Sequence, residues 1–278
     1  MTVGVLLVVL TGALLHASWN LLVKAGHDTR FATAGVYIVA GLISAVALPF
    51  LATPAPASWP YLAASMGTEL IYSILLAAVY RDGDLSHAYP LMRGTAPLLV
   101  AIGSGTLLGE HLSRAVWIGV ALVSCGIFAM IFEVRSQPRS TTATRLALLN
   151  AFVIAAYTTI DGLGVRVSGQ PVAYSLWLFV LIGVPWLIWA TAQGRARWAE
   201  LRHQIPPAAV GGACSLASYT LALWAMTRAP VAAVAAVREV SVVFGTLLGA
   251  IVLHERVTRV RALAAVAIAL GVWAIRAH

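Results

Sequence analysis

The chain has 278 residues, of which 60% are hydrophobic and 10% are charged, and its mean hydropathy is +0.89. A soluble domain carries about 25% charged residues, so this composition excludes a cytosolic fold and favours an integral membrane protein. The formal net charge of +8 is not gathered in a basic stripe on a soluble module, so it does not indicate nucleic-acid binding.

Apolar runs of membrane length follow one another along the chain, because a span needs roughly 20 mostly apolar residues. The fourth and ninth runs are the least uniform, since they carry Arg93 and Arg238. The sequence predicts an all-α integral membrane protein with ten transmembrane helices. The runs are 3–23, 31–51, 61–80, 87–109, 114–133, 144–163, 172–193, 207–226, 230–253 and 258–276.

The segments between the runs are too short to form a soluble domain. The clearest loops are rich in proline, serine, threonine or charge and cover 53–60, 135–145 and 193–207. The first run begins without a basic stretch, so we expect a retained helix in place of a cleaved signal peptide. Cys125 and Cys214 fall inside spans, which indicates ordinary packing thiols and no disulfide.

The basic residues set the expected orientation. With ten spans, the loops after odd-numbered helices share one side of the membrane, and that side holds twelve of the 18 lysines and arginines. The other side holds four, and the remaining two lie within spans. Because an excess of Lys and Arg marks the cytoplasmic side, both termini are predicted to face outward.

One passage occurs twice. LLGEHLSRAVWIG at 107–119 recurs as VLHERVTRVRALA at 252–264, so that Glu110 matches Glu255 at an offset of 145 (255 − 110). Arg93 and Arg238, in the preceding spans, have the same offset (238 − 93).

Each half would hold five helices, an odd number, so the second half inserts upside down relative to the first. Inverted repeats of this kind are typical of transporters, because two mirror-related halves can form alternating gates around one site. The predicted repeats are 1–135 and 144–278.

The duplicated passage resembles the end of the EamA repeat of the drug/metabolite transporter superfamily. The stretches LLGEHLSRAVWIGVALVSCGIFAM and VLHERVTRVRALAAVAIALGVWAI carry the resemblance, and LLHASWNLLVKAG at 14–26 is similar to the family's first helix. The resemblance implies ten helices in two inverted repeats in a bacterial inner membrane, with periplasmic termini. AAYTTIDGLG in the sixth span departs from the Trp-Asn pattern of the first.

The family also implies a function, which is export of small metabolites by alternating access. In length and layout the chain is most similar to exporters of aromatic and other amino acids, so an aromatic or hydrophobic amino acid is the expected substrate. Helices 1, 3, 4, 6, 8 and 9 would surround the cavity, with 2 and 7 alongside and 5 and 10 as peripheral braces. The alternatives are an exporter of cationic drugs, of a nucleoside or of a quaternary amine, and a channel or non-transporting scaffold.

Polar side chains inside spans are costly and usually face the bundle interior. His16, Trp19 and Asn20 share one helix face, because they stand at i, i+3 and i+4. An imidazole, an indole and an amide on one stripe suit a pocket for a ligand with a ring and polar groups. The alternative is interhelical hydrogen bonding with an aromatic packing residue.

Three further spans carry candidate substrate-binding stripes of the same kind. A tyrosine near a membrane end is often only an interfacial anchor, so Tyr80 and Tyr89 are weaker candidates than Tyr72 and Tyr157. The stripes are Glu69, Tyr72, Ser73 and Tyr80 on the third span, Tyr89 and Arg93 on the fourth, and Tyr157 and Asp161 on the sixth. The acidic candidates for a proton relay are Glu69, Asp161 and Glu239, with His16 as a group that titrates nearer neutrality.

Arg93 is the strongest single candidate, because a guanidinium inside a span costs roughly 2.5–3.5 kcal/mol on insertion scales and needs compensation. It could hold a substrate carboxylate bidentately or form a salt bridge with a nearby carboxylate. Snorkelling to the cytoplasmic face is a third explanation. Arg238 would be its outer counterpart, and it projects about 100° away from its neighbour Glu239, so these two are not expected to pair.

Ser113 and Thr258 are expected to cap the fifth and tenth helices, with structural roles for Glu110 and Glu255 beside them. Pro90 and Pro97 should kink the fourth helix.

The chain carries no motif for an enzyme. Its single lysine, Lys24, has no Gly-rich loop before it, which excludes ATP hydrolysis through a P-loop and leaves an ion gradient or the substrate gradient as the energy source. No HExxH motif and no His pair at i, i+4 occur, so we expect no catalytic residue, metal site or cofactor. The expected partners are a small-molecule substrate and membrane lipid, without nucleic acid, and a monomer is one compatible state.

Overall fold

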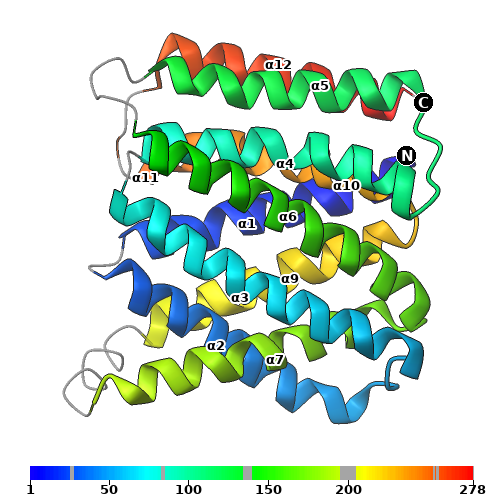
Figure 1. The fold of residues 1–278 in the computed structure, drawn as a ribbon, viewed down its shortest axis with the longest axis vertical. Coiled ribbons are helices and arrows are strands. Elements are labelled where there is room, and N and C mark those ends of the chain that lie inside the picture. Colours follow the sequence, from blue (N-terminus) through cyan, green and yellow to red (C-terminus); the bar gives the residue numbers. More distant parts are fainter. Residues whose placement is uncertain are drawn as a thin grey trace.

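The computed structural model describes residues 1–25, 28–82, 85–133, 140–194, 205–252, 254 and 257–277, and all regular elements within these ranges are helices (Figure 1). The α-helices are α1 (Val3–Ala25), α2 (Thr29–Ala47), α3 (Trp59–Asp82), α4 (Leu85–Leu107), α5 (Arg114–Ala129), α6 (Thr141–Ser168), α7 (Pro171–Ala192), α9 (Ile205–Met226), α10 (Val231–Arg238), α11 (Val240–Val252) and α12 (Arg259–Arg276). Three short 3₁₀ helices are η1 (Leu48–Phe50), η2 (Pro56–Ser58) and η3 (Met130–Glu133).

Each predicted span falls on helical chain, and the ends agree closely except at α6, which runs over 141–168 in place of 144–163. Seven segments are long and apolar enough to cross a membrane: α1, α2 with η1, α5 with η3, α6, α7, α9, and α10 with α11. The helices α3, α4 and α12 have 24, 23 and 18 residues, and their crossing of the membrane stays a prediction.

The ninth predicted span is interrupted. Its two pieces, α10 and α11, are separated by a turn at Glu239, whose backbone N–H donates to the Ala236 carbonyl at 3.1 Å, one residue short of the α-helical partner. By contrast, α4 continues through Pro90 and Pro97 as one helix, and its expected kink stays a prediction. The break therefore lies beside Arg238 and not in the proline-bearing span.

Both expected N-caps are present. The Ser113 hydroxyl accepts from the Val116 N–H at 3.4 Å, and the Thr258 hydroxyl accepts from the Arg261 N–H at 3.2 Å. Each satisfies one of the backbone donors that a helix start leaves unpaired. Glu255 lies outside the described residues.

Both chain ends lie on one side of the bundle (Figure 1). We call the side that carries the start of α1 and the end of α12 the terminal end, and the opposite side, where α1 is followed by α2, the loop end. The helices run between these two ends, and α5 packs along α12 at one edge of the molecule. The common position of the termini agrees with an even number of crossings.

Glycines allow α5 and α12 to approach closely. A Cβ added at Gly119 would lie 2.6 Å from the Gly271 carbonyl oxygen and would also collide with the Ile275 side chain. Gly126 faces α12 in the same way, where an added Cβ would lie 2.9 Å from the Ala264 carbonyl oxygen. The seam therefore depends on the absence of side chains at these positions.

We expect Gly119→Ala to lower the thermal unfolding temperature in detergent, because overpacking a tight contact typically costs about 1–3 kcal/mol. Gly4→Ala is the matched control, since an added Cβ at Gly4 meets nothing within 4 Å. Gly4→Ala should leave the unfolding temperature unchanged or slightly raised, because alanine favours helix over glycine. The seam would be looser than described if both variants unfolded at the same temperature.

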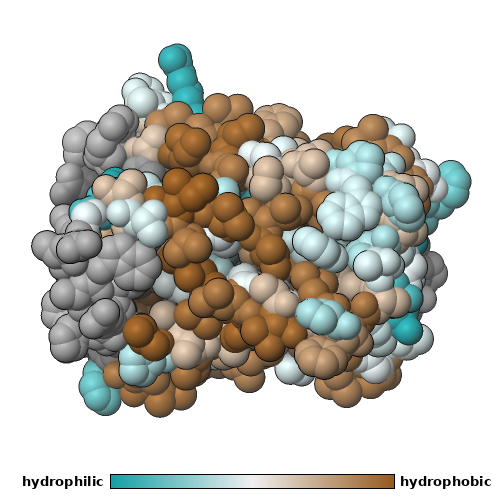
Figure 2. All heavy atoms as spheres, turned by 90° about the horizontal axis from the view of Figure 1, so that it is seen from below, coloured by the Kyte–Doolittle hydropathy of each residue, from teal (hydrophilic) through white to brown (hydrophobic). Residues whose placement is uncertain are grey.

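Large apolar side chains face outward along the helices. Phe50 is 85% exposed, Val46 72%, Ile251 70% and Trp273 67%. Figure 2 shows apolar residues across the middle of one face and hydrophilic residues gathered toward one end. In water this surface would cost roughly 25 cal/mol per Å² of apolar area, whereas lipid removes that cost. The outward pattern is that of helices in contact with a bilayer.

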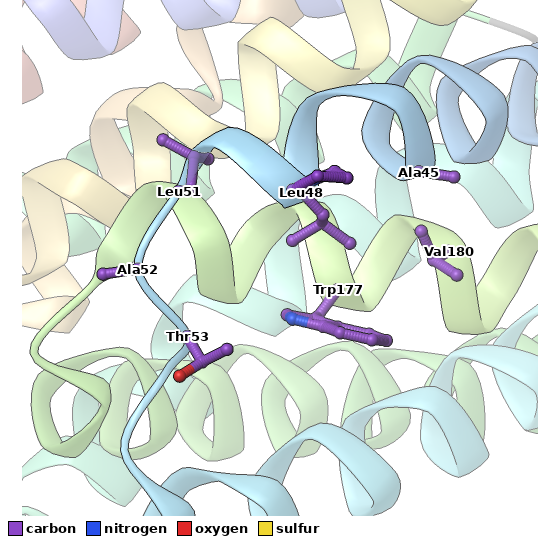
Figure 3. Close-up of a pocket in the computed structure, with 8 residues that line it drawn as sticks. Ala45, Leu48, Leu51, Ala52, Thr53, Trp177 and Val180 are labelled. Carbon is purple, nitrogen blue, oxygen red and sulfur yellow. The ribbon is translucent and has the colours of Figure 1, made fainter.

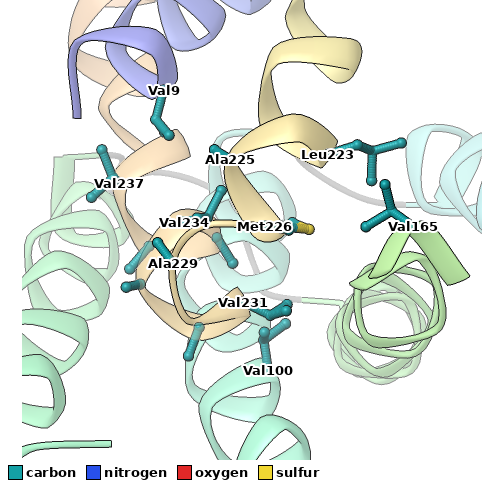
Figure 4. Close-up of a cluster of buried hydrophobic side chains, with 14 of the residues drawn as sticks. Val9, Val100, Val165, Leu223, Ala225, Met226, Ala229, Val231, Val234 and Val237 are labelled. Atoms are coloured by element: carbon teal, nitrogen blue, oxygen red, sulfur yellow. The ribbon is translucent and has the colours of Figure 1, made fainter. Parts of the chain in front are cut away.

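The largest buried core lies toward the terminal end, where α1, α4, α6, α9 and α10 meet (Figure 4). Val9, Leu223, Met226 and Val231 are fully buried there, and Val165 is 1% exposed. An added Cβ at Gly162 would lie 2.6 Å from Val231 Cγ2, so α6 and α10 are in close contact at this level. Buried apolar side chains therefore fill the region where these helices meet.

Candidate functional site

Charged side chains from α3, α4, α6 and the α10–α11 segment gather in the interior of the bundle. Glu69 lies close enough to Asp161 and Arg238 for their charges to interact. Glu239 likewise lies close enough to Arg93 and Arg238 for their charges to interact. The structure thus brings together the five charged residues that the sequence analysis proposed as site candidates.

Arg93 forms an ion pair with Glu239, with 2.9 Å between Nε and Oε2, and the two side chains are 13% and 8% exposed. These two atoms are not aligned as a hydrogen bond. The guanidinium also donates through Nη2 to the Ser241 hydroxyl at 3.3 Å. Three explanations were open for Arg93, and the structure shows the salt bridge, with Glu239 as the partner.

Asp161 is fully buried, and two tyrosines donate to its carboxylate. The Tyr174 hydroxyl donates to Oδ1 at 3.0 Å, and the Tyr219 hydroxyl donates to Oδ2. Gly164 makes this possible, because a Cβ there would collide with the Tyr174 hydroxyl. Asp161 on α6 is thus tied to α7 and α9 through the two tyrosine hydroxyls.

Tyr219 contacts both charges of opposite sign. Its hydroxyl binds Asp161, and the Arg238 guanidinium stands over its ring at 5.0 Å from the centroid. A cation over a tyrosine face is attracted by the ring quadrupole. Within the described residues Arg238 makes no ion pair, so its guanidinium keeps donors that a ligand can use.

Glu69 differs from the other carboxylates. Its side chain is half-buried, and in the described part of the chain its carboxylate receives no hydrogen bond and forms no ion pair. Its charge interacts with those of Asp161 and Arg238. Glu69 is therefore the accessible acidic group of the site, whereas Asp161 is enclosed.

Aromatic side chains surround these charges. Tyr72 and Tyr157 meet edge to face, with ring centroids 6.0 Å apart, and Tyr89 belongs to the same cluster. On α1 the Trp19 indole N–H donates to His16 Nδ1 at 3.3 Å, and both rings are half-buried. The structure thus brings the tyrosines of α3, α4 and α6 into one cluster, and it places His16 of α1 close enough to the site arginines for their charges to affect it.

Two predicted polar groups bond within their own helices. The Asn20 amide donates to the His16 carbonyl at 2.7 Å, and the Ser73 hydroxyl donates to the Glu69 carbonyl at 3.0 Å. Each bond uses one donor of the side chain, and the Asn20 carbonyl oxygen and the Ser73 lone pairs can still accept. The Tyr80 side chain lies outside the described residues.

Sequence reasoning missed Tyr174, Tyr219 and Ser241. Tyr174 has no second polar residue one turn away within its span, and tyrosines are common as interfacial anchors. Ser215 stands one turn before Tyr219 and Arg238 one turn before Ser241, so helical spacing offered a signal for these two. A further signal was available for the tyrosines, because Asp161 has no cation one turn away on its own helix and needed donors from neighbouring spans.

A cavity of about 450 Å³ lies away from these charges, between the end of α2, the segment after it and α7 (Figure 3). Its lining is mostly apolar and contains none of the predicted site residues: Ala45, Leu48, Pro49, Leu51, Ala52, Thr53, Trp177 and Val180. Among the described residues no three His, Cys, Asp or Glu side chains are placed to hold a metal ion.

The chain is similar to known proteins both in sequence, over its second half, and in fold, over nearly its whole length. No curated protein matches the chain. Solved structures do match, and among them is a crystal structure that is similar over 99% of this chain and 96% of its own, with a TM-score of 0.76 and 17% identity, which shows a shared fold. Residues 142–277 match the EamA-like transporter family. The chain is a multi-pass membrane protein whose second half is similar to the EamA-like transporter family.

Proposed function

We propose that the chain is a secondary transporter of the drug/metabolite transporter superfamily that exports small metabolites, namely aromatic or hydrophobic amino acids, by alternating access. The supporting observation is that Arg238 and Glu69 lie near each other in the interior of the bundle. These are a cation and a carboxylate without ion-pair partners in the described residues, close enough to interact and surrounded by tyrosines.

An amino acid in solution is a zwitterion and needs one group of each sign. Arg238 would hold the substrate carboxylate with its planar donors, and Glu69 would face the ammonium. Trp19, Tyr72 and Tyr157 would contact an apolar or aromatic side chain. Arg93 is a weaker candidate for the carboxylate, because Glu239 already neutralises it.

A cationic substrate is the second candidate, and the charge balance of the site supports it. Once Arg93 and Glu239 are paired, two carboxylates, Glu69 and Asp161, stand against one cation, Arg238. Aromatic rings also attract quaternary ammonium groups through their faces. This candidate predicts better transport of amines than of amino acids.

The deciding experiment measures initial transport in proteoliposomes for phenylalanine, its amide and phenethylamine, which share the ring and the ammonium. We expect the wild-type chain to favour phenylalanine, with saturation and counterflow. Arg238→Gln should slow the free acid at least about tenfold and the amide much less, because a hydrogen bond to a charged group contributes roughly 1.5–3 kcal/mol. Glu69→Gln should slow all three.

The outcomes separate the rival functions. Preference for the amine, with little effect of Arg238→Gln, supports the cationic candidate. Flux that neither saturates nor shows counterflow indicates a channel. If none of a wider panel of amino acids, nucleosides and quaternary amines is moved, the transport proposal is wrong.

We also propose that all ten helical segments cross the bacterial inner membrane as two inverted repeats, 1–135 and 144–278, with both termini in the periplasm. The sequence offset of 145 and the twelve-to-four distribution of basic residues support this arrangement. A fluorescent reporter that folds only in the cytoplasm, fused after residue 278, should stay dark. A bright fusion would reverse the orientation.

A further inference from the structure

The two halves of the ninth span differ sharply in burial. In α10, all residues over 231–237 are buried, whereas in α11 only Ser241 and Gly249 are. The α10 half points toward the terminal end and enters the apolar core of Val9, Leu223 and Met226 (Figures 1 and 4). The interior charges are therefore separated from the terminal end by tightly packed side chains.

A group of polar contacts lies at this closed end. Glu110, between α4 and α5, accepts the Val231 backbone N–H with both carboxylate oxygens, at 3.1 and 3.0 Å. It also forms an ion pair with the Arg166 guanidinium near the end of α6, and the two side chains are 10% and 33% exposed. Glu110 thus binds the start of α10, whereas the sequence placed its structural role beside the start of α5.

Arg166 extends the same group to α9. Its Nε donates to the Met226 carbonyl at 2.9 Å, and its Nη2 donates to the Ala229 carbonyl at 3.2 Å. These carbonyls are at the end of α9 and in the link to α10. One carboxylate and one guanidinium therefore connect the α4–α5 link with the ends of three helices.

The contacts of Glu110 with Arg166 and Val231 cross between the two proposed repeats, whereas the bonds from Arg166 to the α9 end and the link lie within the second repeat. Glu110 belongs to 1–135, and Arg166, Met226, Ala229 and Val231 belong to 144–278. Alternating access requires one repeat to move against the other, so contacts that cross at one end must separate when that end opens. A charge-assisted cluster favours the closed arrangement by the amount that it loses on opening.

We propose that Glu110 and Arg166 form a latch that holds the terminal end closed, and that this latch opens in each transport cycle to expose the interior charges on that side. The inference rests on the proposed alternating access and not on the substrate class. Its test reads accessibility without any substrate, so it can fail or succeed independently of the amino-acid assignment.

The test places a reporter cysteine behind the latch. Ala235, 8% exposed in α10, is changed to cysteine in a chain with Cys125→Ser and Cys214→Ser. A membrane-impermeant thiol reagent is then applied to the terminal side of oriented vesicles. We expect slow labelling with the latch intact and labelling roughly tenfold faster or more with Glu110→Gln or Arg166→Gln, because each removes a charge-assisted bond.

Arg228→Gln is the matched control. Arg228 is an exposed arginine near the same link, where it stands over the Trp224 ring at 4.0 Å and does not contact Glu110. It should leave the labelling rate unchanged. Arg166→Lys provides a second variant if the neutral ones fail to reach the membrane, since it keeps the charge and loses the planar fork, and it should also label faster.

Two results would overturn the latch. Fast labelling from the terminal side in the unaltered background means that this end is not closed. Unchanged labelling in the latch variants, even with a lower unfolding temperature, means that Glu110 and Arg166 are a static brace.

Discussion

Asp161→Asn is expected to reduce transport by about tenfold to a hundredfold while the protein still folds and reaches the membrane. The amide has nearly the size of the carboxylate. Its oxygen can accept from one tyrosine hydroxyl and its NH2 can donate to the oxygen of the other, so two hydrogen bonds that tie α6 to α7 and α9 can form. The variant removes the negative charge that interacts with Arg238 and that accepts the two tyrosine hydroxyls. The expected loss corresponds to the roughly 1.5–3 kcal/mol of a hydrogen bond to a charged group.

The same variant distinguishes two roles for Asp161. If Asp161 carries a coupling proton, Asp161→Asn should lose transport driven by a pH gradient and keep substrate exchange between equal concentrations. If Asp161 contributes to substrate binding, exchange should fall as well. Because Asp161 is fully buried beneath two tyrosines, whereas Glu69 is half-buried, we expect exchange to survive better in Asp161→Asn than in Glu69→Gln.

Tyr219→Phe is the control for this variant. It removes the hydroxyl that binds Asp161 and retains the ring beneath Arg238. A smaller loss than in Asp161→Asn is expected, since Tyr174 still donates to the carboxylate. Normal transport in both variants would contradict any functional role for this carboxylate.

The fold could be anticipated from the sequence because hydropathy and length decide helices in a membrane. Every backbone polar group in lipid must be paired within the segment, so an apolar run of about 20 residues has few structures open to it. The cap at Ser113 was equally predictable, because it depends on local bonds. The break at Glu239 was not, since it accompanies an ion pair with Arg93 on another helix, and hydropathy carries no information about such a partner.

The site was anticipated only in part, for a similar reason. Helical spacing identifies residues that share a face of one helix, as with His16 and Trp19, which do bond to each other. It does not say which helices face one another. The contacts of Tyr219 with Asp161 and Arg238 depend on the packing of α9 against α6 and α10, so its importance was visible only in three dimensions.

Glu239→Gln should be strongly destabilising, because it leaves the Arg93 guanidinium inside the bundle without its counter-ion. Removing one partner of a buried ion pair typically costs about 3–5 kcal/mol, whereas removing both often costs little. We therefore expect a much lower unfolding temperature for Glu239→Gln, and a recovery of most of the loss in the double variant Arg93→Gln with Glu239→Gln. The measurement is thermal unfolding of the detergent-purified chain, and additive losses in the double variant would show that the pair contributes no coupling.

The ion pair between Arg93 and Glu239 also bears on whether Arg93 binds the substrate carboxylate. A structural salt bridge predicts that Arg93→Lys lowers stability and slows the free amino acid and its amide alike, because neither substrate contacts the guanidinium. If instead the substrate carboxylate displaces Glu239 during transport, Arg93→Lys loses the bidentate fork and should slow the free acid more than the amide. With Arg93 held by Glu239 at 2.9 Å and Arg238 without an ion pair in the described residues, we expect equal effects for Arg93→Lys and unequal effects for Arg238→Gln. The reverse pattern would exchange the roles of the two arginines and place the carboxylate site on α4.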